Sequence, residues 1–495
     1  MSMITISSHD LGGIATRPTE SPVSGAVVGE ATQPSKVGGL FDDDDDDDDA
    51  SFEKASDEGS SLSEEESDHE DFIIEGKEIS HTNNFDYDTL TKGKVPSRRR
   101  KLFRRRWRRV NTKKALIELK SKLEDALNGN CILAEERNGT SQNCKDITLW
   151  GVPLLPSKGH EGSDIILLKF LKAQNYRVNE AFENLKQTLI WRAEQRIDDI
   201  TNENLGDKKE LNKMVFIDSV DNEGHPLCFN SYGAFKDKEL YTKTFGTEQN
   251  RRDFLRWRVQ FMEQTIKKLS FKPGGVDSFL LISDMKNVPG PGSRMKELGP
   301  MGKDVVSLFQ RYYPELIYKH IILNPPFWYY LYHGVVTQYC TPGTREKFIF
   351  ARPHKVTETL LKYIPPQNIP LQYGGFRRDN DDEFTSDDPV LAFVIRGGAV
   401  LVFRLPISEV NVTVVWEVIV VGWDVSYKDE FIPDDEGSYK ILLHTEEKIE
   451  SCVRNSFYIN EPGKIMISIK NATYVKKRVF VRLKSKATLP LYLYK

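Results

Sequence analysis

The chain has few cysteines, no long apolar run and none of the common catalytic motifs. Five cysteines occur in 495 residues and none forms a Cys-x-x-Cys pair, which argues against a disulfide framework and against a structural zinc site. The most apolar stretch, NVTVVWEVIVVGW, is interrupted by Glu417 and is too short to span a bilayer. The sequence contains no P-loop, nucleophile elbow, His-Glu-x-x-His or glycine-rich dinucleotide turn. We therefore expect a non-enzymatic cytoplasmic protein with no catalytic residue, no metal and no cofactor.

Charge is distributed very unevenly along the chain. Residues 1–90 carry 24 Asp or Glu against four Lys or Arg, including eight consecutive aspartates from Asp42 to Asp49. This region is also poor in apolar residues, so it cannot offset the entropy lost on ordering, and we predict a disordered acidic tail over 1–95. Three serines there precede an acid by three positions and are candidate phosphorylation sites, unless the tail is never modified: Ser61, Ser63 and Ser67.

A basic segment over 96–112 follows the tail. Nine of the twelve positions from Arg98 to Arg109 are Lys or Arg. Apolar side chains among these cations favour a membrane surface, because rings can insert while guanidinium groups bind lipid phosphates. The residues assigned to that contact are Arg98, Arg99, Arg100, Arg104, Arg105, Arg106 and Trp107. The alternatives are a solvated linker and a nuclear or RNA-associated scaffold that this segment targets.

Hydrophobic periodicity divides the remaining chain into three regions. Leucines at helical spacing in KKALIELKSKLEDALNG and the amphipathic pattern of SDIILLKFLKAQNYRVNEAFENLKQ predict a helical subdomain over 113–205, with Ser163 or Asp164 capping the second helix. Strand and helix signals alternate over 206–378 and predict a mixed α/β domain with partly parallel, buried strands. Short strands separated by turns over 385–495 predict an all-β sandwich.

The stretch NPPFWYYLYHG places consecutive aromatic residues on one predicted helix. This is more aromatic surface than one core-facing stripe requires, and aromatic rings with polar tips favour the boundary between water and lipid. We interpret it as a gate helix that closes a lipid cavity; the alternative is a helix buried on all sides. The gate residues are Phe327, Trp328, Tyr329 and Tyr330.

Several motifs together resemble a known family. YYPELIYKHIILNPPFWYY, TPGTREKFIF and IPLQYGGF, with LLKFLKAQNYRVNEA upstream, resemble the CRAL-TRIO lipid-binding domain and its preceding helical subdomain. VVGWDVSYKDEF and GKIMISIKNATYVKKRVFVRL look like a GOLD domain. An acidic tail, a CRAL-TRIO domain and a GOLD domain in this order is the layout of patellins, the plant phosphoinositide-binding trafficking proteins. The resemblance therefore implies a CRAL-TRIO α/β domain with an N-terminal helical subdomain, followed by an all-β GOLD sandwich.

The resemblance also implies a function. The protein would associate peripherally with membranes, bind phosphoinositides and anionic membrane surfaces, and hold a hydrophobic lipid guest. It would take a protein partner through its GOLD domain and bind no specific nucleic acid. The implied process is membrane trafficking, including cell-plate formation in cytokinesis.

Four residues match the positions that hold a phosphoinositol headgroup in the family: Lys172, Glu315, Thr344 and Lys347. Lys347 would pair with the phosphate, Thr344 would donate its hydroxyl, and Glu315 would accept from inositol hydroxyls. Lys172 stands where family members often have Arg, so it keeps the charge but loses the bidentate geometry. The alternative is a purely structural role, in which Lys347 is an ordinary cation at the start of a strand and Glu315 is a capping carboxylate.

The GOLD-like region ends in the basic stretch KNATYVKKRVFVRLKSK. Two sets of cations are expected to face anionic lipid there: Lys476, Lys477 and Arg478 in a hairpin turn, and Arg482, Lys484 and Lys486 on one face of the following strand. The alternative is a solvated edge strand that is protected by its lysines.

Overall fold

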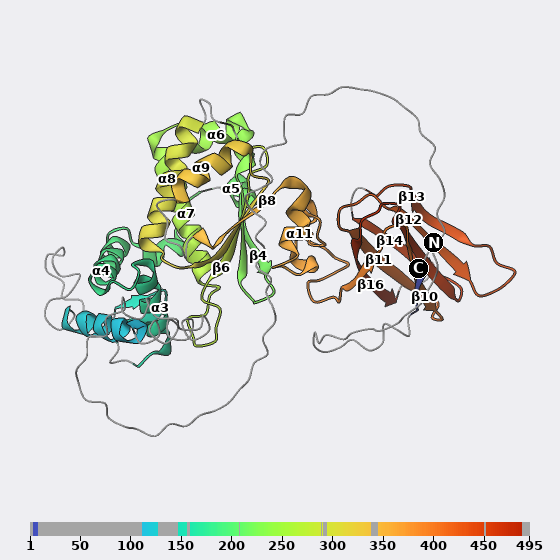
Figure 1. The fold of residues 1–495 in the computed structure, drawn as a ribbon, viewed down its shortest axis with the longest axis horizontal. Coiled ribbons are helices and arrows are strands. Elements are labelled where there is room, and N and C mark those ends of the chain that lie inside the picture. Colours follow the sequence, from blue (N-terminus) through green and yellow to red (C-terminus); the bar gives the residue numbers. More distant parts are fainter. Residues whose placement is uncertain are drawn as a thin grey trace, which may run out of the picture. The chain divides into compact units, whose positions relative to one another are not determined.

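The computed structural model describes residues 3–7, 111–126, 147–155, 159–206, 208–288, 290, 295–337, 345–449 and 452–487. These residues form a helical subdomain, an α/β domain and a β-sandwich, each of which is described by itself (Figure 1). The aspartate run, the Arg-rich segment and the three candidate serines lie outside the described residues.

The helical subdomain is built from amphipathic helices. The helix over 111–126 buries Ala115, Leu119 and Leu123, which recur every four residues and so share one face. The other elements are β2 (Thr148–Leu149), β3 (Val152–Pro153), α3 (Glu161–Ala173), α4 (Val178–Glu194), η5 (Ile197–Asn202) and α5 (Lys209–Met214).

The start of α3 differs from the prediction. The helix begins at Glu161, and the N-cap is His160, whose Nδ1 accepts a hydrogen bond from the Gly162 backbone N–H at 3.0 Å. Ser163 lies inside the helix and donates its hydroxyl to the Pro153 carbonyl at 2.6 Å. The prediction that Ser163 or Asp164 caps this helix was therefore wrong.

A five-stranded sheet in the order β4-β5-β6-β7-β8 forms the centre of the α/β domain. β4 and β5 are antiparallel, whereas β5, β6, β7 and β8 run parallel, in agreement with the predicted mixed sheet. The strands are β4 (Val215–Val220), β5 (Pro226–Ser231), β6 (Phe279–Asp284), β7 (Ile317–Leu323) and β8 (Phe348–Ala351).

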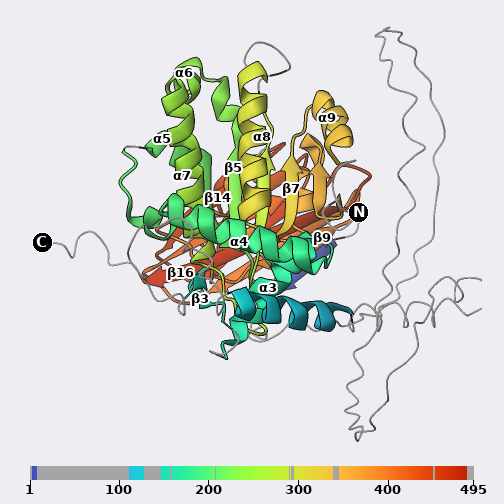
Figure 2. The same ribbon diagram turned by 90° about the vertical axis from the view of Figure 1, so that its left-hand side faces the viewer.

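Helices cover both faces of this sheet, as its parallel strands require. Figure 1 shows α6, α7, α8 and α9 on one face of the sheet and α11 on the other face. In the view of Figure 2, β7 is seen between α8 and α9. The helices are α6 (Lys238–Phe245), α7 (Glu248–Ile266), α8 (Met295–Tyr312), α9 (Phe327–Thr337) and α11 (Val356–Leu360). Short 3-10 turns complete the domain: η6 (Tyr232–Lys236), η7 (Pro353–Lys355), η8 (Pro366–Asn368) and η9 (Leu371–Tyr373).

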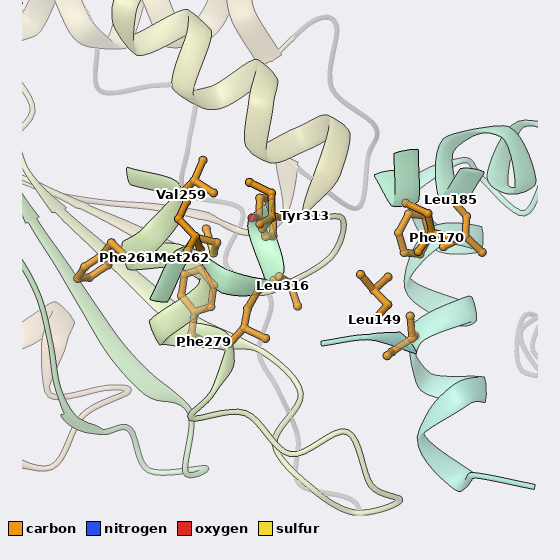
Figure 3. Close-up of a cluster of buried hydrophobic side chains, with 14 of the residues drawn as sticks. Leu149, Phe170, Leu185, Val259, Phe261, Met262, Phe279, Tyr313 and Leu316 are labelled. Carbon is orange, nitrogen blue, oxygen red and sulfur yellow. The ribbon is translucent and has the colours of Figure 1, made fainter. Parts of the chain in front are cut away.

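Two apolar clusters lie on the two faces of the sheet. The larger one includes residues of the helical subdomain as well as the helix-covered face, and Figure 3 shows Phe170 and Leu185 of the subdomain together with Phe279 and Leu316 at the sheet. The smaller cluster fills the opposite face, beneath α11. Among the described helices, none combines the length and apolarity needed to cross a membrane.

The C-terminal region is a sandwich of two sheets, in the orders β1-β10-β15-β12-β13 and β14-β11-β16-β9. Ile465, Ile467 and Ile469 of β15 are fully buried, as their alternation predicts. The strands are β1 (Met3–Ser7), β9 (Leu391–Ile395), β10 (Val400–Ile407), β11 (Val412–Val420), β12 (Ser426–Pro433), β13 (Ile441–Glu446), β14 (Val453–Ile459), β15 (Gly463–Lys470) and β16 (Lys477–Ala487).

Strand β1 was not expected, because residues 1–95 were predicted to be disordered throughout. It pairs in parallel with Val400–Arg404 of β10. Its sequence, MITIS, contains β-branched residues that favour an extended strand. Without β1, this side of β10 would be a sheet edge with unpaired backbone groups.

Candidate functional site

Charged side chains meet at the N-terminal ends of three parallel strands. Asp277 precedes β6, Glu315 precedes β7 and Lys347 precedes β8. The Nζ of Lys347 lies 2.8 Å from Oε2 of Glu315, and both side chains are 25% exposed. The Lys347 carbonyl accepts from the His320 backbone N–H at 2.8 Å, which fixes this lysine beside β7. Two of the four predicted headgroup residues are therefore in direct contact at a partly exposed position.

The backbone of Glu315 adopts a left-handed conformation, with φ of 56°. A non-glycine residue in this region of backbone space costs about 1 to 3 kcal/mol, and such residues cluster at functional sites. The Glu315 carbonyl accepts a hydrogen bond at 3.0 Å from Nζ of Lys169, which belongs to α3. The helical subdomain thus holds the strained residue in place.

Lys169 is the residue at this site that the sequence analysis missed. It is 4% exposed, and its Nζ lies 3.3 Å from Oδ2 of Asp277. Burial lowers the pKa of Lys169, and the negative charge of Asp277 opposes this shift. The sequence signal is its position on α3 between Ile166 and Phe170, both fully buried, where a lysine requires a partner.

The other two predicted headgroup residues are placed differently. Lys172 is exposed on the last turn of α3, and its charge is close enough to lower the pKa of Lys169 further. Thr344 lies outside the described residues. The cluster as described contains the cations Lys169, Lys172 and Lys347 against the acids Asp277 and Glu315, which leaves one excess positive charge.

The sheet face beneath α8 and α9 is only partly covered. Leu281 of β6, His320 of β7, and Phe348 and Phe350 of β8 are half-buried, although β6 and β7 are inner strands of the sheet. On the opposite face Leu280, Ile282 and Ile321 are fully buried, whereas Ile349 of the edge strand β8 is half-buried. The helix-covered face therefore offers an accessible, largely apolar surface that an apolar ligand can contact.

One side of α9 packs on strand β8 through aromatic contacts. The ring centroids of Tyr330 and Phe350 are 5.3 Å apart, and those of His333 and Phe348 are 4.6 Å apart. These contacts attach the helix to the edge strand of the sheet without an ion pair between their side chains. They can therefore rearrange without separating buried charges.

The other side of α9 faces solvent. Phe327 is 79% exposed and Leu331, one turn later, is 62% exposed. Among the four predicted gate residues, only Phe327 is exposed, whereas Trp328, Tyr329 and Tyr330 are half-buried. The exposed pair forms an apolar patch of the kind that marks an interaction site.

The basic turn predicted in the GOLD-like region is corrected at one residue. Lys477 belongs to β16, is 9% exposed and donates to the Gly422 carbonyl at 2.9 Å. It is therefore an internal hydrogen-bond donor, and its assignment as a surface cation was wrong. Lys476 is exposed, and Arg478 is half-buried with its guanidinium 6.0 Å from the Phe480 ring.

The three alternating cations of β16 share one face, but acids of the chain itself occupy that face. The ion pairs join Arg482 to Glu417 (2.5 Å), Lys484 to Asp388 (3.4 Å) and Lys486 to Glu383 (2.6 Å). Arg482 is only 2% exposed. The expectation that this face is free to meet anionic lipid was therefore wrong, because Glu417 of β11 and two acids that precede β9 neutralise it.

A concave surface with a volume of about 450 Å³ lies beside Lys476. Tyr474 is fully exposed and Val475 is 62% exposed next to it. An exposed aromatic ring with neighbouring cations suits a boundary between water and lipid or the centre of a protein interface. The lining residues are Arg396, Gly397, Gly398, Ala472, Thr473, Tyr474 and Lys476.

Comparison with known proteins identifies both folds. Residues 211–375 match the CRAL/TRIO domain, and residues 396–478 match the C-terminal GOLD domain described as Patellin-1-like. Patellin-3 of Arabidopsis thaliana is 39% identical over 381 residues, which cover 76% of this chain and 74% of that protein. The chain belongs to the patellin family. The predicted CRAL-TRIO domain and GOLD sandwich are thereby confirmed.

Two further relatives show how far the similarity extends. Patellin-4 of Arabidopsis thaliana is 45% identical over 345 residues, which cover 69% of this chain and 62% of Patellin-4. The match therefore spans less than two thirds of that patellin. The phosphatidylinositol transfer protein sfh5 of Sclerotinia sclerotiorum is 28% identical over 255 residues, which cover 48% of this chain and 58% of that protein.

Proposed function

We propose that this patellin is a cytoplasmic, peripheral membrane protein that binds phosphoinositides and carries or presents a lipid guest. The headgroup binds at Lys347 and Glu315, and the guest lies on the partly covered sheet face beneath α9. The protein acts in membrane trafficking, including cell-plate formation, and catalyses no bond change. The observation that carries the proposal is the contact between Lys347 and Glu315 on a backbone that Lys169 holds in a strained conformation.

The geometry supports exchange of one anion for another at Lys347. Glu315 balances the charge of Lys347, with Oε2 2.8 Å from Nζ. A headgroup phosphate takes this position through charge-assisted hydrogen bonds, and the freed carboxylate accepts from inositol hydroxyls. The excess positive charge of the cluster favours an anionic ligand. Lys169 keeps the Glu315 backbone in place during the exchange.

The surfaces on both domains support peripheral attachment. Phe327 and Leu331 of α9 can enter the boundary between water and lipid. Tyr474 and Lys476 of the GOLD domain provide a second contact, for a membrane or a protein partner. The relative sfh5 is a phosphatidylinositol transfer protein, and this similarity, together with the similarity to patellins, supports the same class of ligand.

Vesicle flotation tests the headgroup assignment. Wild type and Lys347→Ala are mixed with vesicles of phosphatidylcholine alone or with added phosphoinositide, and the floated fraction is measured. Lys355→Ala is the matched control, because Lys355 is an exposed lysine of the same domain that pairs with Glu358 at 2.8 Å. We expect phosphoinositide-dependent flotation that Lys347→Ala loses and Lys355→Ala keeps. Equal flotation on both vesicles, or no effect of Lys347→Ala, contradicts the assignment.

The RNA-associated alternative is tested with the same proteins. Filter binding to RNA is measured beside flotation at increasing salt. Purely electrostatic binding to RNA falls steeply with salt. Retention on RNA that exceeds retention on phosphoinositide vesicles at every salt concentration would favour the alternative function.

A further inference from the structure

The α/β domain contains a buried arginine with no acidic partner. Arg258 of α7 is 6% exposed, and its Nη1 donates to Oδ1 of Asn230 of β5 at 3.1 Å. No ion pair of the described residues includes Arg258, whereas its neighbour Arg256 pairs with Glu203. A buried charge without a counter-ion loses several kcal/mol of hydration free energy. Binding of an anion would offset this loss.

Asn230 carries a second unused donor at the same place. This side chain is 1% exposed, and its Nδ2 has no hydrogen-bond acceptor among the described residues. A guanidinium group has only donors, so it fixes the amide with Oδ1 toward Arg258 and leaves Nδ2 free. The two residues together present N–H groups from two side chains and no acceptor for them.

The surroundings of Arg258 stabilise its charge only in part. Its Cζ lies 5.8 Å from the ring centroid of Trp257 and 5.7 Å from those of Phe261 and Phe309. Cation–π contacts contribute up to about 2 kcal/mol each when desolvated, but they accept no strong hydrogen bond. Cys228 cannot serve as the anion, because burial raises the pKa of its thiol to about 12.

A row of polar side chains connects this place to the partly covered face. Asn230 of β5 lies in register with Ser283 of β6, so their side chains point to the same face of the parallel sheet. The Ser283 hydroxyl lies 2.8 Å from Nε2 of His320 on β7, which is half-buried beneath α9. Polar groups therefore continue from Arg258 to the surface on which the proposed lipid guest lies.

We propose that Arg258 and Asn230 bind the oxyanion of an amphiphilic guest inside the α/β domain. The ligand is a carboxylate or phosphate on a long apolar chain, whose tail packs on the side chains of the sheet face. The guanidinium and the free amide N–H groups of Asn230 bind the oxygen atoms, while the three aromatic rings exclude water. This site rests on the proposal that the domain holds a lipid guest, and it is separate from the headgroup site at Lys347.

Three probes with the same apolar chain test the site: oleate, oleoyl lysophosphatidate and the neutral oleyl alcohol. Equilibrium binding of each probe, as monomer, is measured on the full chain as wild type, Arg258→Met and Arg258→Lys. Arg258→Met keeps the length of the side chain and removes an unpaired buried charge, so we expect it to fold. Arg256→Met is the matched control, because Arg256 lies on the same helix and already has a carboxylate partner.

We expect wild type and Arg256→Met to bind an anionic probe at least tenfold more tightly than the alcohol. In Arg258→Met the affinities for the anionic probe and for the alcohol should lie within about threefold of each other. Arg258→Lys should retain part of the preference for the anionic probe, because a lysine can still form charge-assisted hydrogen bonds. A preference for oleate identifies a carboxylate ligand, and a preference for lysophosphatidate identifies a phosphate ligand. Equal binding of all probes by wild type, or an unchanged preference in Arg258→Met, overturns the proposal and leaves Arg258 as a cation held by its rings.

Failure of this inference can be told apart from failure of the proposed function. Arg258→Met should still float with phosphoinositide vesicles, and Lys347→Ala should still prefer an anionic probe to the alcohol. If flotation depends on Lys347 but no probe distinguishes Arg258→Met, only the interior oxyanion site is wrong. If none of the three probes binds the wild type, both the interior site and the lipid guest are wrong.

Discussion

Replacing Glu263 by Met should destabilise the α/β domain by about 3 to 5 kcal/mol, because it leaves a buried arginine without its counter-ion. Glu263 of α7 is 7% exposed and accepts hydrogen bonds from Arg192 of α4 at 2.5 Å and from the Tyr313 hydroxyl at 2.6 Å. Methionine is similar in length and accepts neither bond. The guanidinium of Arg192, which is itself 4% exposed, would remain buried.

The expected magnitude depends on whether another acid can replace Glu263. Asp198 also binds Arg192 at 2.6 Å, but its side chain is 75% exposed. An exposed carboxylate contributes only about 0 to 1 kcal/mol to an ion pair, so it cannot compensate for the loss. Replacing both Arg192 and Glu263 by Met removes both charges and leaves chiefly the Tyr313 hydroxyl unpaired, at about 1 to 3 kcal/mol. The double variant should therefore recover about 2 kcal/mol of the loss.

Amide hydrogen exchange of the full chain tests this prediction, because it measures the stability of each domain separately. Peptides from α7 of the α/β domain and from α4 of the helical subdomain, which contribute to one apolar cluster, report the free energy of opening. A loss of about 3 kcal/mol accelerates their exchange by roughly a hundredfold. Peptides from β15 of the GOLD domain should not change and serve as the internal control. A loss below about 1 kcal/mol in the single variant, or a double variant as unstable as the single one, would refute the reasoning.

Three further outcomes are expected. Glu417→Gln should destabilise the GOLD domain by about 3 kcal/mol, measured by exchange of β15 peptides, because the fully buried Glu417 is the counter-ion of several arginines. Burial lowers the pKa of His320 to about 3 in the folded protein, whereas the imidazole of an unfolded chain has a pKa of roughly 6.5. As the pH falls from roughly 6.5 to 5, the unfolded chain therefore becomes protonated at His320 and the folded protein does not. The domain should then lose about 1.5 kcal/mol of stability, and His320→Gln should remove this part of the pH dependence from exchange of β7 peptides. Lys169→Met should weaken flotation on phosphoinositide vesicles about tenfold without changing Lys347, because Glu315 loses the donor that holds its carbonyl.

The elements that the sequence predicted well are those with a strong local period. Leu119 and Leu123 recur at helical spacing, and Ile465, Ile467 and Ile469 alternate, so each set shares one face whatever the rest of the chain does. The buried faces of these elements and the class of each domain follow from such patterns. The order of strands in the sandwich does not, because it depends on which edges meet across long stretches of chain.

The partners of charged residues could not be predicted for a related reason. Alternation correctly placed Lys484 and Lys486 on one face, but it carries no information about Asp388 and Glu383, which lie about a hundred residues away and neutralise them. The position of Lys169 on α3 signals that it needs a partner, but it does not name Asp277 or the Glu315 carbonyl, which come from distant parts of the chain. Periodicity indicates which way a side chain points, whereas its charge partner is decided by tertiary packing.

The two ligand sites proposed for the α/β domain lie toward opposite ends of its parallel strands. Asn230 is in register with Ser283, and Ser283 is in register with Ile322 near the end of β7. Glu315 precedes Ile322 by seven residues, and at about 3.3 Å per residue this places the sites on the order of 20 Å apart.

A single headgroup cannot bridge that distance, so a phosphoinositide at Lys347 and an oxyanion at Arg258 must be different groups. Each group then depends on its own cation. The double variant should therefore lose flotation as Lys347→Ala does and lose the probe preference as Arg258→Met does, with no further loss in either assay, as expected for sites that share no partner. Loss of the probe preference in Lys347→Ala alone, or of flotation in Arg258→Met alone, would mean that one ligand group serves both cations.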